Sequence, residues 1–221
     1  MKKIRILIAD DHSVVRIGLA ALFKTVPDFE VVGTAKDGEE AAAKTLAEKP
    51  DVVIMDLLMP GLNGIDATKE IVARTRASRS PSPGGTDQQP RPRVLILTTF
   101  ATSDGIMHAF DAGASGAVLK TSSDEELIAS IRRIASGDDH YLSDEVRQLI
   151  CEDPPVEELT KRQREILEDV TRGLTNSDIA NHFGIREASV KEHLVGIFGK
   201  IGASNRAEAV AIALRKHLLK I

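Results

Sequence analysis

The chain contains few cysteines, few aromatic residues and no long apolar run. Its 221 residues include one cysteine, Cys151, no tryptophan, one tyrosine and six phenylalanines. A single cysteine excludes an internal disulfide framework and fits a reducing compartment, so we expect a cytoplasmic protein. The scarcity of aromatic side chains disfavours a binder of single-stranded nucleic acid, which needs stacking platforms for bases. The apolar run after Lys3 is too short for a signal peptide or a membrane span, so we expect no membrane contact.

Length and charge together indicate two domains. Domains usually contain about 100 to 200 residues, so this chain is long enough for two. Residues 1–154 carry 18 Lys and Arg against 24 Asp and Glu, a net charge of -6, whereas residues 155–221 carry 11 against 9, a net charge of +2. The acidic part favours a cation or carboxylate site, and the mildly basic part is compatible with nucleic acid binding.

Short aliphatic runs alternate with helical patterns in the first domain, which we place at residues 1–136. Buried strands are predicted at 3–9, 51–55, 93–98 and 115–119, with a weaker strand at 30–35. Helices are predicted at 13–25, 38–48, 63–73, 104–112 and 123–136. Five strand-to-helix alternations predict an α/β fold with a five-stranded, doubly wound parallel sheet. The segment 74–92, rich in Pro, Gly, Ser and Arg, is interpreted as a solvated loop, with a basic patch for a partner as the alternative.

Polar residues follow the predicted strands where ligands bind in doubly wound sheets. Asp10 and Asp11 end the first strand, Asp56 the third, Thr98 the fourth and Lys120 the fifth. Three converging carboxylates repel one another, and a hard cation such as Mg²⁺ would relieve that repulsion. The metal, the ammonium group and the hydroxyl group could each stabilise a phosphoryl oxygen, with Asp56 left as the nucleophile.

These strand ends lie within four motifs that resemble those of response-regulator receiver domains. The motifs are residues 9–12 (ADDH), 55–64 (MDLLMPGLNG), 97–100 (LTTF) and 112–120 (AGASGAVLK). The resemblance covers about the first 136 residues and implies a flavodoxin-like receiver that is not an enzyme in its own right. It also implies that Asp56 accepts phosphate from a sensor histidine kinase. Asp11 would bind Mg²⁺ directly, Asp10 partly through water, and Asp56 and the backbone carbonyl of Leu58 would complete the protein ligands.

The resemblance further implies that Thr98 and Lys120 sense the phosphoryl group. Two features depart from the family pattern. The residue three positions before Lys120 is commonly Tyr or Phe, whose ring swings inward when the threonine moves, but here it is Ala117. The insertion at 74–92 is longer than family loops at that place. Phosphate chemistry at Asp56 is therefore predicted, while its route to the output domain stays open.

Only helical periodicity follows Ser143, so the second domain is predicted to be all-α with four helices. Residues 137–158 are interpreted as a linker with a short helix, because the segment 151–158 is acidic and contains two prolines. Helices are predicted at 160–172, 175–182 and 186–201 and from 205 onward, the first with a capping box. Gly184 joins the second and third helices, which is typical of a helix-turn-helix.

The third of these helices is predicted to read DNA. Its apolar residues recur at helical spacing and should face the core: Val190, Leu194, Ile197 and Ile201. The opposite face could enter a major groove, where Val195 would meet a thymine methyl group and Glu192 a cytosine amino group. Gly196 and Gly199 indicate either a close backbone approach to DNA or tolerated defects. The predicted DNA contacts are Thr175, Ser189, Lys191, Glu192, Val195 and Lys200.

Residues 159–221 are similar to a LuxR-type helix-turn-helix domain. The matching motifs are residues 159–167 (LTKRQREIL), 173–180 (GLTNSDIA), 189–194 (SVKEHL) and 205–210 (NRAEAV). Joined to a receiver, this domain resembles the NarL/FixJ family across the whole chain. That resemblance implies a transcriptional response regulator that binds double-stranded DNA and forms a homodimer when phosphorylated. The alternatives are a receiver whose output ignores phosphorylation or acts through protein partners, and an α/β phosphotransferase, for which no Gly-rich phosphate loop is present.

Overall fold

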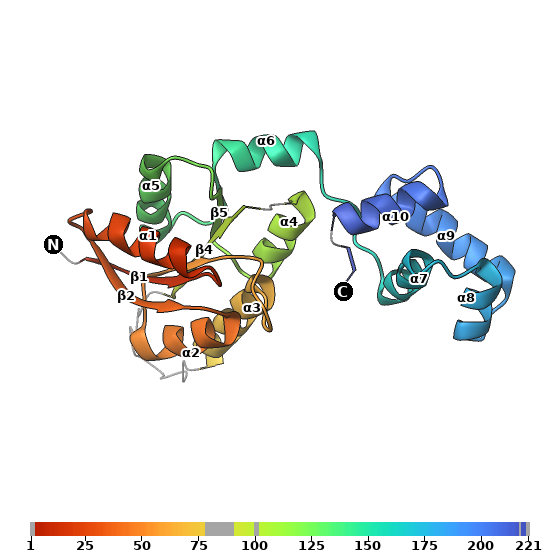
Figure 1. Ribbon diagram of the computed structural model, residues 1–221, viewed down its shortest axis with the longest axis horizontal. Coiled ribbons are helices and arrows are strands. Elements are labelled where there is room, and N and C mark those ends of the chain that lie inside the picture. Colours follow the sequence, from red (N-terminus) through yellow and green to blue (C-terminus); the bar gives the residue numbers. More distant parts are fainter. Residues whose placement is uncertain (1–2, 78–90, 100–101, 217, 220–221) are drawn as a thin grey trace, which may run out of the picture. The chain divides into compact units, whose positions relative to one another are not determined.

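The computed structural model describes residues 3–77, 91–99, 102–216 and 218–219, and the chain divides into two compact units (Figure 1). The first unit comprises Met1–Ala101 and Gly105–Glu152, and the second comprises Thr102–Asp104 and Asp153–Ile221. Most of the predicted loop at 74–92 lies outside the described residues. Among the described helices, none combines the length and the apolar character needed to cross a membrane.

A parallel sheet forms the centre of the first unit. Its strands lie in the order β2-β1-β3-β4-β5-β6, and every neighbouring pair is parallel. The strands are β1 (Ile4–Ala9), β2 (Phe29–Ala35), β3 (Val52–Met55), β4 (Arg93–Thr98), β5 (Gly116–Leu119) and β6 (Tyr141–Leu142). The helices of this unit are α1 (Ser13–Lys24), α2 (Gly38–Glu48), α3 (Gly64–Ala77), α5 (Asp124–Ala135), α6 (Asp144–Glu152) and, from Gly105 onward, α4 (Ser103–Asp111). The predicted doubly wound α/β fold is confirmed, including the weaker strand at 30–35.

The sheet separates two hydrophobic cores because successive strand side chains point to opposite faces. In β1, Ile6 and Ile8 enter a core covered by α1 and α5, whereas Leu7 and Ala9 enter the core covered by α2, α3 and α4. All four side chains are buried. Burial on both faces explains why these strands appear in the sequence as continuous apolar runs rather than as alternating patterns.

The sixth strand was not predicted from the sequence. β6 pairs in parallel with β5, with Gly116 opposite Tyr141 and Ala117 opposite Leu142. Two residues are too few to produce a period-two pattern, so no strand is predicted here from the sequence. A Cβ atom at Gly116 would lie 2.6 Å from the Cδ1 atom of Ile134 and 3.0 Å from the carbonyl oxygen of Tyr141. Glycine therefore permits the close approach of β6, after which Val146 of α6 packs into the same core as Ala117.

The second unit contains the predicted all-α domain. Its helices are α7 (Lys161–Thr171), α8 (Asn176–Phe183), α9 (Glu187–Ile201) and α10 (Arg206–Arg215). The capping box expected at the start of the first is present, since Thr160 and Gln163 exchange side-chain to backbone hydrogen bonds. A second capping box, made by Thr175 and Asp178, begins α8. One hydrophobic core unites the four helices and includes Ile166, Ile179, Val190, Ile197 and Ile212.

Candidate functional site

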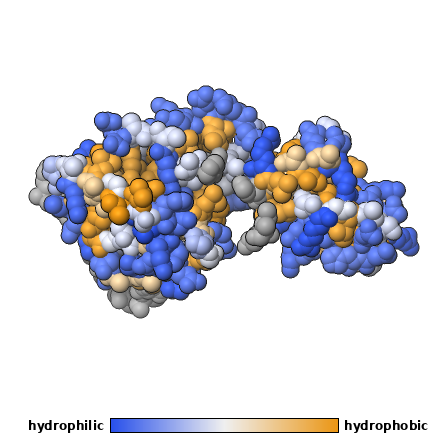
Figure 2. Space-filling view, viewed as in Figure 1, coloured by the Kyte–Doolittle hydropathy of each residue, from blue (hydrophilic) through white to orange (hydrophobic). Residues whose placement is uncertain are grey.

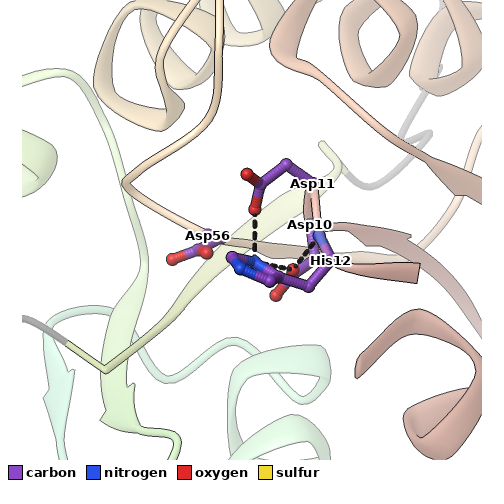
Figure 3. A group of neighbouring side chains, drawn as sticks. All are labelled: Asp10, Asp11, His12 and Asp56. Atoms are coloured by element: carbon purple, nitrogen blue, oxygen red, sulfur yellow. Dashed lines mark hydrogen bonds and ion pairs between the residues drawn. The ribbon is translucent and has the colours of Figure 1, made fainter. Parts of the chain in front are cut away.

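An acidic cluster lies at the carboxyl ends of β1 and β3. Asp10, Asp11 and His12 follow β1, and Asp56 follows β3. One ligand atom from each of these four residues lies within 4.8 Å of the others, and Figure 3 shows the His12 ring among the three carboxylates. Asp10 and Asp56 are 2% and 5% exposed. The structure thus brings together the carboxylates that the strand-end argument predicted, at the edge where doubly wound sheets bind ligands.

Lys120 supplies the positive charge of the cluster. It follows β5, and its Nζ atom lies 2.5 Å from Oδ2 of Asp10 and 2.7 Å from Oδ2 of Asp56. Burial alone would lower the pKa of Lys120, but the hydrogen bonds and charges of Asp10 and Asp56 outweigh that effect, so its pKa is raised above the ordinary value. The ammonium group therefore stays charged and offsets part of the repulsion between the two carboxylates.

Thr98 presents a polar group without a partner. It is the last residue of β4 and is buried, and its hydroxyl oxygen has no hydrogen-bond partner among the described residues. Its backbone carbonyl accepts a hydrogen bond from the Lys120 amide at 2.9 Å, which fixes the two residues side by side. Leaving a buried polar group unpaired costs about 1–3 kcal/mol. Such a hydroxyl group at the edge of a charged cluster is suited to a ligand oxygen.

His12 and Leu58 complete the surroundings of the cluster. The Nδ1 atom of His12 lies 2.6 Å from Oδ1 of Asp11, an oxygen that solvent does not reach. The His12 backbone amide also donates to Oδ1 of Asp10 at 2.8 Å. Leu58 lies in the loop after β3, two residues beyond Asp56, and its side chain is half exposed. His12 belongs to the motif at residues 9–12, but its place beside the carboxylates was not predicted, although its adjacency to Asp11 was a usable signal.

The second unit has the geometry of a helix-turn-helix. Gly184 ends α8 in the left-handed conformation, with φ of 64°, and α9 begins three residues later. In α9 the side chains of Val190, Leu194, Ile197 and Ile201 are buried as predicted. The packed face of the helix therefore leaves the opposite face to solvent.

The exposed face of α9 carries most of the predicted DNA contacts. Lys191, Glu192 and Val195 are exposed, and Val195 is 74% exposed. Ser189 is half-buried beside them. Lys200, in the last turn of α9, is directed toward the segment before α7. Its ammonium group donates to the carbonyl oxygen of Glu158 at 2.7 Å.

Thr175, the sixth predicted DNA contact, belongs to the start of α8. Its hydroxyl group donates to the carboxylate of Asp178 at 2.6 Å and accepts from the Asp178 amide. The pKa of Asp178 is lowered, chiefly by the Thr175 side chain and then by the Thr175 backbone amide. The structure thus gives Thr175 a capping role in α8.

Comparison with known families matches both units of the chain. Residues 6–132 match the model of the response regulator receiver domain, and residues 157–213 match that of the bacterial regulatory proteins of the luxR family. The protein belongs to the NarL/FixJ family of response regulators. It is accordingly a DNA-binding response regulator of a two-component system.

Relatives of this regulator align over nearly its whole length. The transcriptional regulatory protein LiaR of Bacillus subtilis (strain 168) is 35% identical over 223 residues, which cover 98% of this chain and 99% of LiaR. The oxygen regulatory protein NreC of Staphylococcus aureus (strain bovine RF122 / ET3-1) is 34% identical over 229 residues, with the same two coverages.

Solved structures agree with this assignment. The crystal structure of ChrA, the response regulator of a heme-sensing two-component system, is 34% identical, covers 99% of this chain and 100% of ChrA, and superposes with a TM-score of 0.55. A structure of two RcsB dimers bound to two parallel DNAs gives a TM-score of 0.68 at 20% identity, covering 97% of this chain and 99% of RcsB, and so supports the fold alone.

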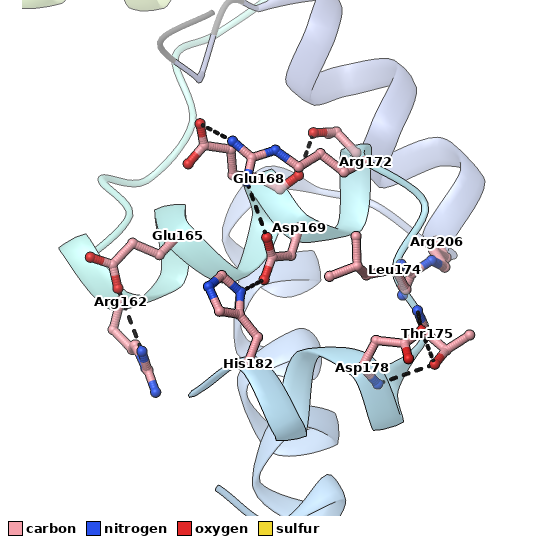
Figure 4. A network of polar contacts seen from close by, with 11 residues as sticks. Arg162, Glu165, Glu168, Asp169, Arg172, Leu174, Thr175, Asp178, His182 and Arg206 are labelled. Atoms are coloured by element: carbon pink, nitrogen blue, oxygen red, sulfur yellow. Dashed lines mark hydrogen bonds and ion pairs between the residues drawn. The ribbon is translucent and has the colours of Figure 1, made fainter. Parts of the chain in front are cut away.

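A contact between a buried carboxylate of α7 and a histidine of α8 was not predicted from the sequence. Asp169 of α7 is 2% exposed, and its Oδ2 atom lies 2.5 Å from Nδ1 of His182 in α8 (Figure 4). Nη1 of Arg172 lies 3.5 Å from Oδ1 of the same carboxylate. Asp169 and His182 are 13 residues apart on different helices, so no spacing rule joins them. A contact of Arg206 in α10 was likewise not predicted. Its guanidinium group donates to the carbonyl oxygen of Leu174 and so holds the loop between α7 and α8.

Proposed function

We propose that Asp56 accepts a phosphoryl group from a phosphohistidine of a sensor kinase, and that this reaction controls dimerisation and promoter binding. The observation that carries the proposal is the buried cluster in which Lys120 bridges Asp10 and Asp56. A carboxylate oxygen of Asp56 would attack phosphorus, forming an O–P bond while the N–P bond breaks and the imidazole leaves with the electron pair. The Lys120 ammonium and the unpaired Thr98 hydroxyl would then stabilise phosphoryl oxygens.

The residues of the cluster fit a magnesium ion. Asp10, Asp11 and Asp56 offer carboxylate oxygens within 4.8 Å of one another, and oxygen is the ligand atom that Mg²⁺ prefers. We propose these three residues and the backbone carbonyl of Leu58 as the protein ligands. When bound, Mg²⁺ would neutralise charge on the phosphoryl oxygens during transfer.

We propose that an apolar stripe on α1 seats the kinase. Val14, Ile17, Gly18 and Ala21 are exposed and recur at helical spacing, with Val14 at 80% and Ile17 at 69% exposure. Figure 2 shows hydrophobic side chains gathered over α1 on this face. The stripe begins at Val14, two residues after His12 of the acidic cluster, so a kinase helix that packs against it would place its histidine on the Asp56 side of the sheet.

The exposed face of α9 is proposed to read base pairs in a major groove. Val195 would contact a thymine methyl group, Glu192 would accept from a cytosine amino group, and Lys191 and Ser189 would reach bases or phosphates. Thr175 and Lys200 are proposed at the edges of this interface, where phosphate contacts would add to their bonds within the domain.

The fourth helix of the output domain is proposed as the dimer contact. Ala207, Val210, Ala211 and Leu214 lie at helical spacing on α10; Val210 is half-buried and the other three are exposed. Two weakly basic domains joined in this way would bind two half-sites, giving an affinity that one domain alone does not provide. We propose a receiver at 1–136, a linker at 137–158 whose β6 and α6 pack on the receiver, and an output domain at 159–221 as the units of this response, which would take place in the cytoplasm.

Phosphorylation with a small-molecule donor tests the proposed chemistry. Incubation with acetyl phosphate and Mg²⁺ should add the mass of one phosphoryl group, and EDTA should prevent the addition. Asp56→Asn should add none, because an amide is not a nucleophile here, whereas Asp111→Asn, at an exposed position that ends α4, should be labelled like the wild type. Full labelling of Asp56→Asn would refute the assignment.

An output that ignores phosphorylation is the second candidate, and Ala117 favours it. This residue is buried in the same core as Val146, at the position where the resemblance to receiver domains implies an aromatic ring that moves on phosphorylation. Duplex affinity, measured for phosphorylated and unphosphorylated protein on a bound promoter, separates the two candidates. Equal affinities would favour the second; tighter binding of the phosphorylated protein would support the first.

A further inference from the structure

The guanidinium group of Arg16 holds the turn that carries two of the clustered aspartates. Nη1 of Arg16 donates to the backbone carbonyl of Asp10 at 2.6 Å and to that of Asp11 at 2.9 Å. Arg16 lies one helical turn into α1, and its own amide donates to the carbonyl of His12. Within the described part of the chain it forms no ion pair with a carboxylate. Its hydrogen-bonding capacity is therefore directed at this turn.

The two carbonyl groups need such a donor because of where they stand. Asp10 directly follows β1, and its amide donates to the carbonyl oxygen of Ala35 at the end of β2 at 3.1 Å. Helix α1 then begins at Ser13. The carbonyls of Asp10 and Asp11 precede the helix, so its amides do not reach them, and His12 makes no side-chain capping bond. Unpaired backbone groups near a buried site are costly. Arg16 satisfies both groups and thereby fixes the backbone from which both carboxylates project.

We propose that Arg16 is a positioning residue that sets the affinity of the acidic cluster for Mg²⁺. This inference rests on the proposed phosphorylation site. Mg²⁺ demands near-ideal octahedral geometry, so its affinity depends on how precisely its carboxylate ligands are held. Residues that orient metal ligands typically contribute about 10 to 100-fold to metal affinity. Arg16 does so through the peptide backbone and does not touch the ion.

If Arg16 positions the ligands, removing its charged group should weaken Mg²⁺ binding. If Arg16 acts only as a nearby positive charge, the same change should strengthen Mg²⁺ binding. A cation near a Mg²⁺ site repels the ion, so loss of the Arg16 charge alone would tighten binding. Loss of the two hydrogen bonds would instead free the turn and weaken binding. We expect Arg16→Met to bind Mg²⁺ about tenfold more weakly. Arg16→Lys should show a smaller loss, because one ammonium group does not reproduce the planar guanidinium.

Calorimetric titration of the full-length protein with MgCl₂, without a phosphodonor, measures this affinity directly. Arg5→Met is the matched control, since Nη1 of Arg5 also donates to a backbone carbonyl, that of Lys49 at 3.0 Å, at the opposite end of β1. Its Mg²⁺ affinity should equal that of the wild type. In acetyl phosphate assays, Arg16→Met should raise the half-saturating Mg²⁺ concentration more than it lowers the maximal rate of phosphorylation.

The outcomes separate this inference from the proposed function. If the wild type neither binds Mg²⁺ nor takes up phosphate on Asp56, the proposed function fails. If it does both and folded Arg16→Met binds Mg²⁺ as tightly or more tightly, the inference about Arg16 alone is wrong. If Arg16→Met is unfolded, Arg16→Lys carries the test, and unchanged affinity in that variant would overturn the inference.

Discussion

Gly64 offers a sharp test of how the chain is packed around Asp56. It is the first residue of α3, and a Cβ atom added there would lie 2.0 Å from the carbonyl oxygen of Asp56 and 2.9 Å from the Cα atom of Leu57. Real Cβ atoms essentially never approach heavy atoms closer than 3.0 Å, so the backbone would have to move by about 1 Å. In Gly64→Ala, either α3 or the residue that we propose as phosphoacceptor is displaced.

The cost of that displacement follows from the backbone nature of the contact. Overpacking costs typically about 1–3 kcal/mol, and a backbone oxygen does not turn aside as a flexible side chain would. We therefore expect Gly64→Ala to lower the free energy of unfolding of the first unit by about 2 kcal/mol. With a urea dependence of about 2 kcal/mol per molar, the unfolding midpoint should fall by about 1 M. Labelling by acetyl phosphate should also slow, since a misplacement of about 1 Å can cost up to about 100-fold.

The assay exploits the composition of the chain. Tyr141 is the single tyrosine and the chain lacks tryptophan, so tyrosine fluorescence in urea reports on the first unit. Gly18→Ala is the control: a Cβ atom at Gly18 meets nothing within 4 Å, and the position is inside α1. Alanine there should stabilise by up to about 1 kcal/mol. If Gly64→Ala matched the wild type in stability and labelling, the inferred contact with Asp56 would be wrong.

Three further outcomes are expected. Ala117→Phe should lose about 1–3 kcal/mol of stability in thermal unfolding followed by circular dichroism, because Ala117 is buried in a filled core; an unchanged midpoint would show that the ring has room. His182→Ala should lose about 1–3 kcal/mol by leaving the buried Asp169 carboxylate poorly paired, and adding Asp169→Leu should recover much of it; an additive loss would contradict the pairing. The pKa of Asp178 is lowered in the folded protein, so its contribution to stability is present above pH 3.8, the ordinary pKa, and is lost as pH falls through the folded pKa. Asp178→Asn should therefore flatten the acid dependence of α8 helicity, and an unchanged acid transition would refute this cap.

Much of the fold was predictable because its signals are local. Aliphatic runs marked five of the strands, and the capping residues Thr160 and Thr175 marked two helix starts of the output domain. The sixth strand escaped prediction because Tyr141 and Leu142 have no pattern of their own. They become a strand only through pairing with β5, which is a tertiary effect.

The site residues that directly follow a strand were predictable, because the strand determines where they lie. Asp10, Asp56 and Lys120 meet because parallel strands end at one edge of the sheet. The contacts of Arg16 were not predictable, since they depend on the direction in which α1 leaves the acidic turn. The pairing of Asp169 with a histidine of the next helix likewise depends on how two helices cross, which spacing along the chain does not encode.

The short strand β6 has a practical consequence for dissecting this regulator. Without it, β5 would be the outer strand of the sheet, with its backbone groups open to pairing with another molecule, which is a common origin of aggregation. A truncated protein that stops at residue 136 would lack both β6 and the packing of Val146 from α6. A truncation after Glu152 keeps both, so the longer fragment should remain monodisperse on concentration while the shorter one self-associates.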